Sequence, residues 1–262
     1  MKTLRDFARA RERGEKITML TAYDASCAAA MAQAGVDCLL IGDSLGMVVA
    51  GYDNTVPVGV AQMAYHAAAV ARGAPHVWRI VDMPFMSYAT VEEALRNARV
   101  LLQEGCANMV KLEGGSAAQM AVIAALHAQH VPVCAHLGLT PQSVDKLGGY
   151  RQVGRSAEEA ARLRAEAQQA VAAGADMLLL ECVPPALAAE ITTTSRVPVI
   201  GIGSGAATDG QVLVSYDVLG ISAHLPYFSK NFLGETGIVG AFATYVQDVK
   251  NKAFPEAKHA RD

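Results

Sequence analysis

Eight short apolar runs, separated by longer Ala-rich segments, recur along the chain from residue 17 onward. Runs of this length that are rich in Val, Ile and Leu predict buried strands, and the segments between them have the periodicity of helices. Strands that alternate with helices in this way pair in parallel. The runs cover residues 17–20, 38–42, 77–81, 108–112, 131–135, 177–180, 197–202 and 212–216. Eight such units predict a (β/α)8 TIM barrel.

The ends of the intervening segments carry helix signals. Thr90 and Ser156 precede acidic residues and predict helix N-caps. Gly35, Gly105 and Gly174 stand where C-caps are expected. The helices are expected over residues 25–33, 60–72, 91–104, 117–129, 157–173, 186–193 and 233–250. The positions of the predicted caps therefore agree with the helix boundaries that the periodicity predicts.

No segment has the composition of an interdomain linker, so we expect a single barrel domain over residues 1–262. A chain of 262 residues is about the size at which such a barrel closes as one unit. Residues 1–16 are expected to form a helix that covers the bottom of the barrel, and residues from about 252 to 262 a frayed tail. Residues 138–155 are expected to form the longest loop without secondary structure, and such loops are often functional.

The composition excludes several classes of protein. A net charge of −3 and the lack of a dense Lys/Arg block argue against nucleic acid and anionic membranes as partners. The five cysteines are scattered without a C-x-x-C pair, which argues against a disulfide framework or a zinc site and favours a cytoplasmic location. Residues 1–16 lack the apolar segment of a secretory signal, and polar residues interrupt the most apolar stretch, 117–135. We therefore expect no targeting segment and no membrane span.

Polar side chains follow five of the apolar runs, at the point where each predicted strand ends. Reactive groups in barrel enzymes lie at this end of the strands. A single acid after a strand is more often a helix cap or a solvated loop residue, but five polar strand ends favour a functional site. These residues are Asp43, Asp82, Glu113, His136 and Glu181.

The alternation of side chains along a strand groups these residues further. Because residues two apart share a face, Lys111 and Glu113 project together, and inward-facing strand ends would place them with Asp43 and Asp82. An unpaired buried ammonium is strongly disfavoured, so the pattern predicts that Lys111 belongs to an active site. The same alternation sends Arg79 to the outer face, where a helix carboxylate or a subunit contact is its expected partner.

Converging carboxylates repel one another, and the usual remedies are protonation or a divalent cation. An all-oxygen set without Cys or clustered His favours Mg²⁺, with Mn²⁺ or Co²⁺ as substitutes. A metal held by few carboxylates keeps positions open for a bidentate 2-oxo acid. It would also stabilise the enolate that forms when the adjacent C–H proton is lost.

Other candidate residues allow two interpretations each. Ser44 either hydrogen-bonds a substrate carboxylate or caps a loop helix, and His136 either donates to a substrate or is satisfied at its strand end. The GIGSG segment at 201–205 either offers backbone N–H groups to an anion or forms a tight turn. Tyr23 and Asp24 either form a turn and a helix cap, which is the favoured interpretation, or line the pocket.

Longer motifs occur in order along nearly the whole chain. They are TAYD at 21–24, IGDSLGM at 41–47, DMPFMSY at 82–88, VKLEGG at 110–115, HLGLTPQS at 136–143, LGGYRQVGR at 147–155, LECVP at 180–184 and IGIGSG at 200–205. Together they resemble the motifs of the ketopantoate hydroxymethyltransferase family. The family often reads CGHLG and IGAG where this chain has Ala135 and Ser204, so each position gains a small side chain beside the expected site.

The resemblance implies a homodecameric (β/α)8 barrel that binds Mg²⁺. It implies transfer of a hydroxymethyl group from 5,10-methylenetetrahydrofolate to 3-methyl-2-oxobutanoate in pantothenate biosynthesis, through a metal-stabilised enolate. The products would be 2-dehydropantoate (ketopantoate) and tetrahydrofolate. Residue by residue, it places Asp43, Asp82 and Glu113 on the metal, Asp43, Ser44, Asp82 and Lys111 on the oxo acid, and Glu181 as the catalytic base. His136 is a further expected substrate ligand.

Two alternatives lead to different functions. Barrels of the phosphoenolpyruvate mutase and isocitrate lyase group share acidic strand ends, Mg²⁺ and oxo-acid enolates, but they generally carry a catalytic cysteine in a K-K-C-G-H type loop, and this chain has no such string. The other alternative is a catalytically silent barrel that binds an oxo acid or serves only as an assembly subunit. Lys111 and Glu181 beside three possible metal ligands count against it.

Overall fold

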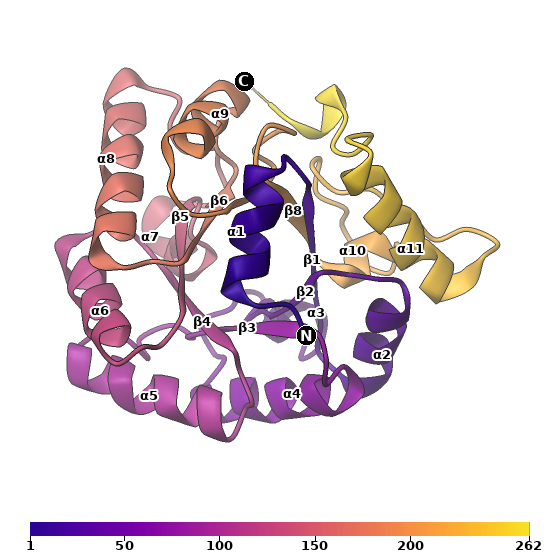
Figure 1. Ribbon diagram of the computed structural model, residues 1–262, viewed down its shortest axis with the longest axis horizontal. Helices are drawn as coiled ribbons and strands as arrows, with labels where there is room; N and C mark the ends of the chain where they lie inside the picture. The colour runs from indigo at the N-terminus through magenta and orange to yellow at the C-terminus, as the bar shows by residue number, and fades with distance from the viewer. Residues whose placement is uncertain (262) are drawn as a thin grey trace.

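The computed structural model describes residues 1–261, and of Leu147 it describes the backbone alone. Eight parallel strands close into a barrel in chain order, with β8 paired to β1. Helices surround the barrel, and α1 lies across one end of it (Figure 1). The expected (β/α)8 TIM barrel is therefore confirmed.

The strands and helices follow the expected runs closely. The strands are β1 Ile17–Thr21, β2 Cys38–Ile41, β3 Trp78–Asp82, β4 Met109–Glu113, β5 Val133–Gly138, β6 Met177–Glu181, β7 Val199–Ile202 and β8 Gly210–Leu213. The α-helices are α1 Leu4–Glu12, α2 Ala25–Gln33, α3 Leu45–Val48, α4 Val60–Gly73, α5 Val91–Gln103, α6 Ala117–Ala128, α7 Val144–Leu147, α8 Ala157–Ala173, α9 Pro185–Thr194, α10 Ser215–Val218 and α11 Gly237–Lys250. Two short 3₁₀ helices are η1 Pro141–Ser143 and η2 Ala257–His259.

Most of the expected helix caps form. The hydroxyl oxygens of Thr90 and Ser156 accept from the backbone N–H groups of Glu93 and Glu159, which satisfies donors in the first turns of α5 and α8. Gly174 ends α8 in the left-handed region at φ 107°. After α5 the expectation is wrong by one residue, because Cys106 rather than Gly105 takes the positive φ.

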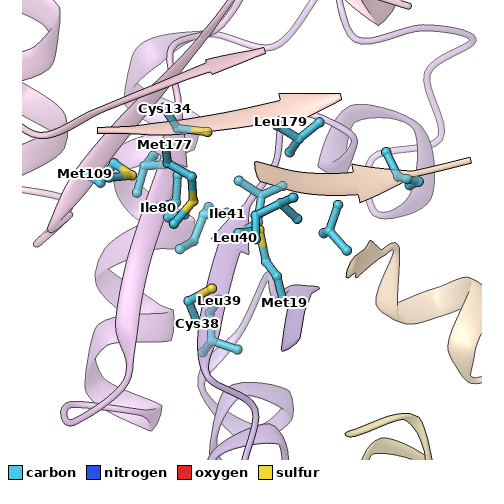
Figure 2. Close-up of a cluster of buried hydrophobic side chains, with 14 of the residues drawn as sticks. Met19, Cys38, Leu39, Leu40, Ile41, Ile80, Met109, Cys134, Met177 and Leu179 are labelled. Carbon is cyan, nitrogen blue, oxygen red and sulfur yellow. The ribbon is translucent and has the colours of Figure 1, made fainter. Parts of the chain in front are cut away.

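The barrel interior is filled by apolar side chains, as parallel strands covered by helices require. Figure 2 shows part of this core, where β1 to β6 contribute side chains such as Met19, Ile80, Met109 and Met177. These four are 0% exposed. Met109 and Lys111 are two residues apart on β4, so both point into the barrel. The apolar layer that contains Met109 therefore lies directly below the polar strand ends.

The N-terminal helix covers the bottom of the barrel, as expected. Phe7 is 1% exposed and its ring meets the ring of Trp78, at the start of β3, with centroids 6.0 Å apart. The Arg11 guanidinium lies 3.2 Å from the carboxylate of Asp209, which immediately precedes β8. Both contacts are at the amino ends of strands, opposite the polar strand ends.

The last long helix, α11, holds the seam of the barrel between β1 and β8. The Tyr245 hydroxyl lies 3.0 Å from the carbonyl oxygen of Met19 on β1 and 2.9 Å from that of Gln211 on β8. Lys250 also forms an ion pair with the buried Asp37 before β2, and Lys2 reaches the same carboxylate. The first and last parts of the fold therefore meet at the bottom of β2.

Three sequence expectations need correction. The C-terminal tail is not frayed as far as the described residues reach, because Phe254 is 2% exposed and packs against Phe232 and Tyr245. The segment 138–155 is not without structure, since it contains η1 and α7. The eighth strand spans Gly210–Leu213 rather than 212–216, because residues 210 and 211 pair with β7 and Ser215 already begins α10.

Within the described part of the chain, Arg79 does not pair with a helix carboxylate, the first of its two expected partners. Its guanidinium donates to the carbonyl oxygens of Cys106 at 2.9 Å, Val77 at 2.8 Å and Ala74 at 3.3 Å rather than to a helix carboxylate. Ala74 follows α4 directly, so the cation satisfies backbone acceptors where that helix ends.

Across residues 1–261, none of the helices combines the length and apolarity needed to cross a bilayer.

Candidate active site

Six polar residues that the sequence singled out meet at the carboxyl ends of β2 to β6. The pairing of neighbouring strands sets Asp82 beside Lys111 and Glu113 beside His136. Asp43, Asp82, Lys111, Glu113 and His136 are each 5% exposed or less. The Glu181 side chain, at the end of β6, is 15% exposed. We call these six residues the acid cluster.

Lys111 lies among the carboxylates, as the alternation along β4 predicts. Its Nζ atom is 3.0 Å from Asp82 Oδ1 and 3.8 Å from Glu113 Oε1. Burial acts to lower the pKa of Lys111, but the negative charges of Asp82, Glu113 and Asp43 outweigh it and raise the pKa above its usual value. Lys111 is therefore a buried ammonium at neutral pH.

Asp43 and Asp82 form the most crowded pair of carboxylates. The backbone N–H of Asp43 donates to Asp82 Oδ2 at 3.1 Å. Burial raises the pKa of both groups, and the charges of Asp82 and Glu113 raise that of Asp43 further, whereas Lys111 opposes the rise at Asp82. Although Lys111 is close, Asp82 Oδ1 has no partner with hydrogen-bond geometry. Two charged carboxylates are therefore disfavoured at this position, and Asp82 Oδ1 is an unsatisfied acceptor.

Glu113 is held as an anion. Burial alone would raise its pKa, but the charge and hydrogen bond of His136, together with Lys111, keep the pKa below its usual value. Its Oε1 atom lies 3.2 Å from His136 Nδ1, and its Oε2 atom accepts from the backbone N–H of Gln142 at 3.0 Å. Both carboxylate oxygens are therefore engaged.

His136 stands between two carboxylates. Its Nε2 atom lies 3.3 Å from Glu181 Oε2, on the side away from Glu113. Burial and the charge of Lys111 lower the pKa of His136, but Glu113 and Glu181 outweigh them and raise it to about 9. The ring is therefore an imidazolium at neutral pH. In this charged form Nδ1 carries a hydrogen and donates it to Glu113. Nδ1 therefore cannot accept a hydrogen bond from Lys111 Nζ, which lies 3.2 Å from it.

The remaining candidates lie near the same end of the barrel. Ser44 precedes α3 but makes no capping hydrogen bond, and its hydroxyl is 2.9 Å from that of Tyr23. Asp24 caps α2 by accepting from the N–H of Cys27 at 2.8 Å, as expected. Buried Ser204 donates to the Leu180 carbonyl at 2.9 Å, which ties the loop after β7 to β6 and favours the turn interpretation of GIGSG.

Gln142 is a buried part of this site that the sequence interpretation missed. Its Nε2 donates to Asp43 Oδ2 at 2.8 Å and to the Met83 carbonyl at 3.0 Å, and its Oε1 accepts from Tyr88 at 2.5 Å. Since its backbone N–H holds Glu113, one residue orients two acids of the cluster. A neutral amide in a loop gives no charge signal, and the only sequence hint is its place in the HLGLTPQS motif.

The chemistry of Asp43 and Asp82 fits Mg²⁺. This cation favours oxygen ligands and is usually held by one or two carboxylates with water or substrate in the other positions. The unsatisfied Asp82 Oδ1 supplies an acceptor for it. Within residues 1–261, no three His, Cys, Asp or Glu side chains are arranged to enclose an ion. The two aspartates therefore supply ligands of the type that Mg²⁺ takes, whereas Glu113 can ligate directly only after its contacts rearrange.

Several solved structures share this barrel fold. A phosphonopyruvate hydrolase in complex with oxalate and Mg²⁺ superposes with a TM-score of 0.64 at 14% identity, covering 99% of this chain and 93% of that one. A 2,3-dimethylmalate lyase of the phosphoenolpyruvate mutase and isocitrate lyase superfamily gives 0.61 at 16% identity, covering 97% and 99%. At these identities the likeness shows the fold alone.

Similarity in sequence is much closer to another group. The profile of the ketopantoate hydroxymethyltransferase family matches residues 1–257. A 3-methyl-2-oxobutanoate hydroxymethyltransferase of Shewanella oneidensis is 53% identical over 251 residues, covering 95% of this chain and 94% of the relative. One from Pseudomonas fluorescens, named 3-methyl-2-oxobutanoate hydroxymethyltransferase 2, is 52% identical over 261 residues, covering 98% and 97%. The chain therefore belongs to the ketopantoate hydroxymethyltransferase family of enzymes.

Proposed function

We propose that the protein transfers a hydroxymethyl group from 5,10-methylenetetrahydrofolate to 3-methyl-2-oxobutanoate. The products are 2-dehydropantoate and tetrahydrofolate, as pantothenate biosynthesis requires. The observation that carries the proposal is the meeting of Asp43, Asp82 and buried Lys111 within reach of a second acid–base pair, His136 and Glu181. The names of the relatives support the choice of oxo acid.

Substrate binding rests on Lys111 and the residues around it. The oxo acid carries a carboxylate, and the Lys111 ammonium is a buried cation that can pair with it. The Ser44 hydroxyl, held by Tyr23, can donate to a second oxygen. His136 is the further candidate donor, through the Nε2–H on the side of the ring away from Glu113.

Asp43 and Asp82 would hold Mg²⁺, with Glu113 as the third predicted ligand. When bound, the ion supplies Lewis acidity that polarises the keto group and acidifies the neighbouring C3–H bond. A phosphonopyruvate hydrolase with the same fold has been solved in complex with oxalate and Mg²⁺, which supports this ion as the choice of metal.

Glu181 acts as the base in the proton step. A carboxylate oxygen of Glu181 takes the C3 proton, and the C–H electron pair moves toward the keto oxygen to give the enolate. His136 Nε2, 3.3 Å from Glu181 Oε2, orients the carboxylate. Lys111 offsets the charge that develops on the substrate.

Water adds to the methylene carbon of the folate iminium ion, and tetrahydrofolate leaves as the carbon–nitrogen bond breaks and the nitrogen takes the proton. C3 of the enolate then attacks the carbonyl carbon of the formaldehyde that remains, and its oxygen takes a proton to become the hydroxyl group. Atoms and charges balance with the two substrates and one water molecule.

An exchange measurement tests the proposal without the folate. Enzyme, Mg²⁺ and 3-methyl-2-oxobutanoate in D₂O are expected to replace the C3 hydrogen with deuterium, which NMR follows, and a chelator should stop the exchange. Adding 5,10-methylenetetrahydrofolate should then give 2-dehydropantoate. A barrel that neither exchanges nor turns over would instead match the catalytically silent alternative.

The assembly and location are further parts of the proposal. The resemblance to the family supports a homodecamer, and the scattered cysteines support a cytoplasmic location. Light scattering coupled to gel filtration would measure the mass of the assembly.

A further inference from the structure

A cavity of about 480 Å³ opens beside the acid cluster. It lies among the segments that follow β3, β4 and β5 and the first half of α8, and its wall includes Glu113 and Gln142. This volume lies in the range of sites for small molecules and cofactors. A small branched oxo acid held at Asp43 and Lys111 leaves this cavity for another occupant.

Part of the cavity wall is apolar. Leu137, Val153 and Leu163 line it and are 5% exposed or less. At the rim, Phe85 is 41% exposed and Met86 is 62% exposed. Met86 has a φ of 62°, a conformation that costs free energy for a residue other than glycine and is common at ligand sites. These surfaces suit a flat, largely aromatic molecule.

Cations stand at the outer part of the same cavity. Lys146, Arg151 and Arg162 line it, and within residues 1–261 Lys146 forms no ion pair with a carboxylate. The side chains of Arg151 and Arg162 are 47% and 55% exposed and pair with Glu159 and Glu166. Exposed pairs of this kind contribute little, so these guanidinium groups can turn to an anionic ligand at small cost.

We propose that this cavity, which we call the donor cavity, binds the reduced folate that donates the one-carbon unit. This inference rests on the proposed function. The ring system lies against the apolar walls, with its inner end at Glu113, so that the transferable carbon faces the oxo acid. The glutamate tail reaches Lys146, Arg151 and Arg162 at the rim, where its carboxylates pair with the cations.

A second apolar groove serves as a contrast. It has a volume of about 350 Å³, lies between α5 and α6 on the outside of the barrel, and includes Arg99. No residue of the acid cluster lines it. A donor bound there could not reach the oxo acid. Arg99→Ala is therefore the matched control, because it also removes a cation that lines a cavity, but one away from the acid cluster.

Kinetics of both substrates test the donor cavity. KM for the folate should rise by about tenfold in each of Lys146→Ala and Arg162→Ala, the effect of losing one charged hydrogen bond, and by more in the double variant. The rise should be larger for a polyglutamylated folate than for the monoglutamate, because a longer anionic tail makes more contacts with the rim. KM for the oxo acid and folate-free C3 exchange should stay within about twofold of the starting enzyme, because neither needs the rim. Arg99→Ala should change none of these quantities.

A steric variant gives an independent test. Ala89 is exposed and lines the donor cavity, so Ala89→Trp should fill it without burying a polar group, and circular dichroism would confirm folding. The expected result is a raised KM for the folate with folate-free exchange retained. An unchanged folate KM in both the Trp variant and the double variant would overturn the donor cavity. Loss of exchange in the unmodified enzyme would instead overturn the proposed function.

Discussion

The Nε2 atom of His136 lies 3.3 Å from Oε2 of Glu181, while the other ring nitrogen lies 3.2 Å from Glu113. One charged ring therefore joins the proposed base to a predicted metal ligand. In this arrangement the orientation of Glu181 depends on β5 as well as on its own strand.

Glu181→Gln should lower C3 exchange by about 10²-fold to 10⁴-fold, the usual contribution of a general base. The amide keeps the size of the side chain but cannot take the proton. Deuterium incorporation followed by NMR measures the effect, and Mg²⁺ affinity should change little. Full exchange in this variant would show that another group is the base.

Asp82→Ala should abolish Mg²⁺-dependent binding of 3-methyl-2-oxobutanoate. Removal of this side chain leaves Asp43 as the remaining aspartate and frees Lys111 from its nearest partner at 3.0 Å. Calorimetric titration of the oxo acid with and without Mg²⁺ measures the loss. Glu104→Gln, at an exposed carboxylate after α5, is the matched control and should bind normally. Unchanged affinity in Asp82→Ala would refute its role as a ligand.

Gln142→Leu should lower the free energy of unfolding by about 2 kcal/mol, because it leaves buried partners such as the Tyr88 hydroxyl without their hydrogen bonds. It should also weaken Mn²⁺ binding, measured by electron paramagnetic resonance, since Asp43 loses the amide that orients it. Tyr88→Phe should lower stability less, because it removes only one of these contacts. Mn²⁺ affinity unchanged in Gln142→Leu would mean that the amide does not set the ligand geometry.

Asp37→Asn should lower stability at neutral pH by about 2 kcal/mol, the scale of hydrogen bonds to charged groups. Burial acts to raise the pKa of Asp37, but Lys2, Lys250 and Thr18 outweigh it and keep the pKa below its usual value. A lowered folded-state pKa gives stability that is present above the unfolded pKa, near 3.9, and is lost as pH falls through the folded value.

Denaturant unfolding of Asp37→Asn between about pH 2 and 7 measures this dependence. The difference from the unmodified protein should shrink as the solution is acidified. A difference that stays constant down to the lowest pH would show that the carboxylate charge contributes nothing.

Local signals in the sequence were enough to predict most of the fold. Thr90 and Ser156 are followed by acids and form the expected N-caps, because a cap needs only its own first turn. The predicted bounds of the eighth strand are wrong because its register depends on pairing with β7 and β1, and a local pattern carries no information about either partner. Phe254 was assigned to a frayed tail because its partners, Phe232 and Tyr245, lie elsewhere in the chain.

The candidate site was predictable to the extent that it carries charge. Asp82, Lys111 and Glu113 end strands with a two-residue period, and geometry then brings them together. Gln142 and Tyr88 were missed because neutral side chains in loops become informative only when their partners are known. The contacts of Glu113 with His136 and Gln142 likewise cannot be predicted from the order of residues along the chain.

The contacts of Tyr245 across β1 and β8 have a consequence for biosynthesis. Because α11 follows β8 in the chain, a nascent chain that still lacks this helix has its first and eighth strands joined by their own pairing alone. Strand edges that open at this weaker seam can pair with other chains, which is a common route to aggregation. Protection of the growing chain by a chaperone would matter most between the synthesis of β8 and that of α11.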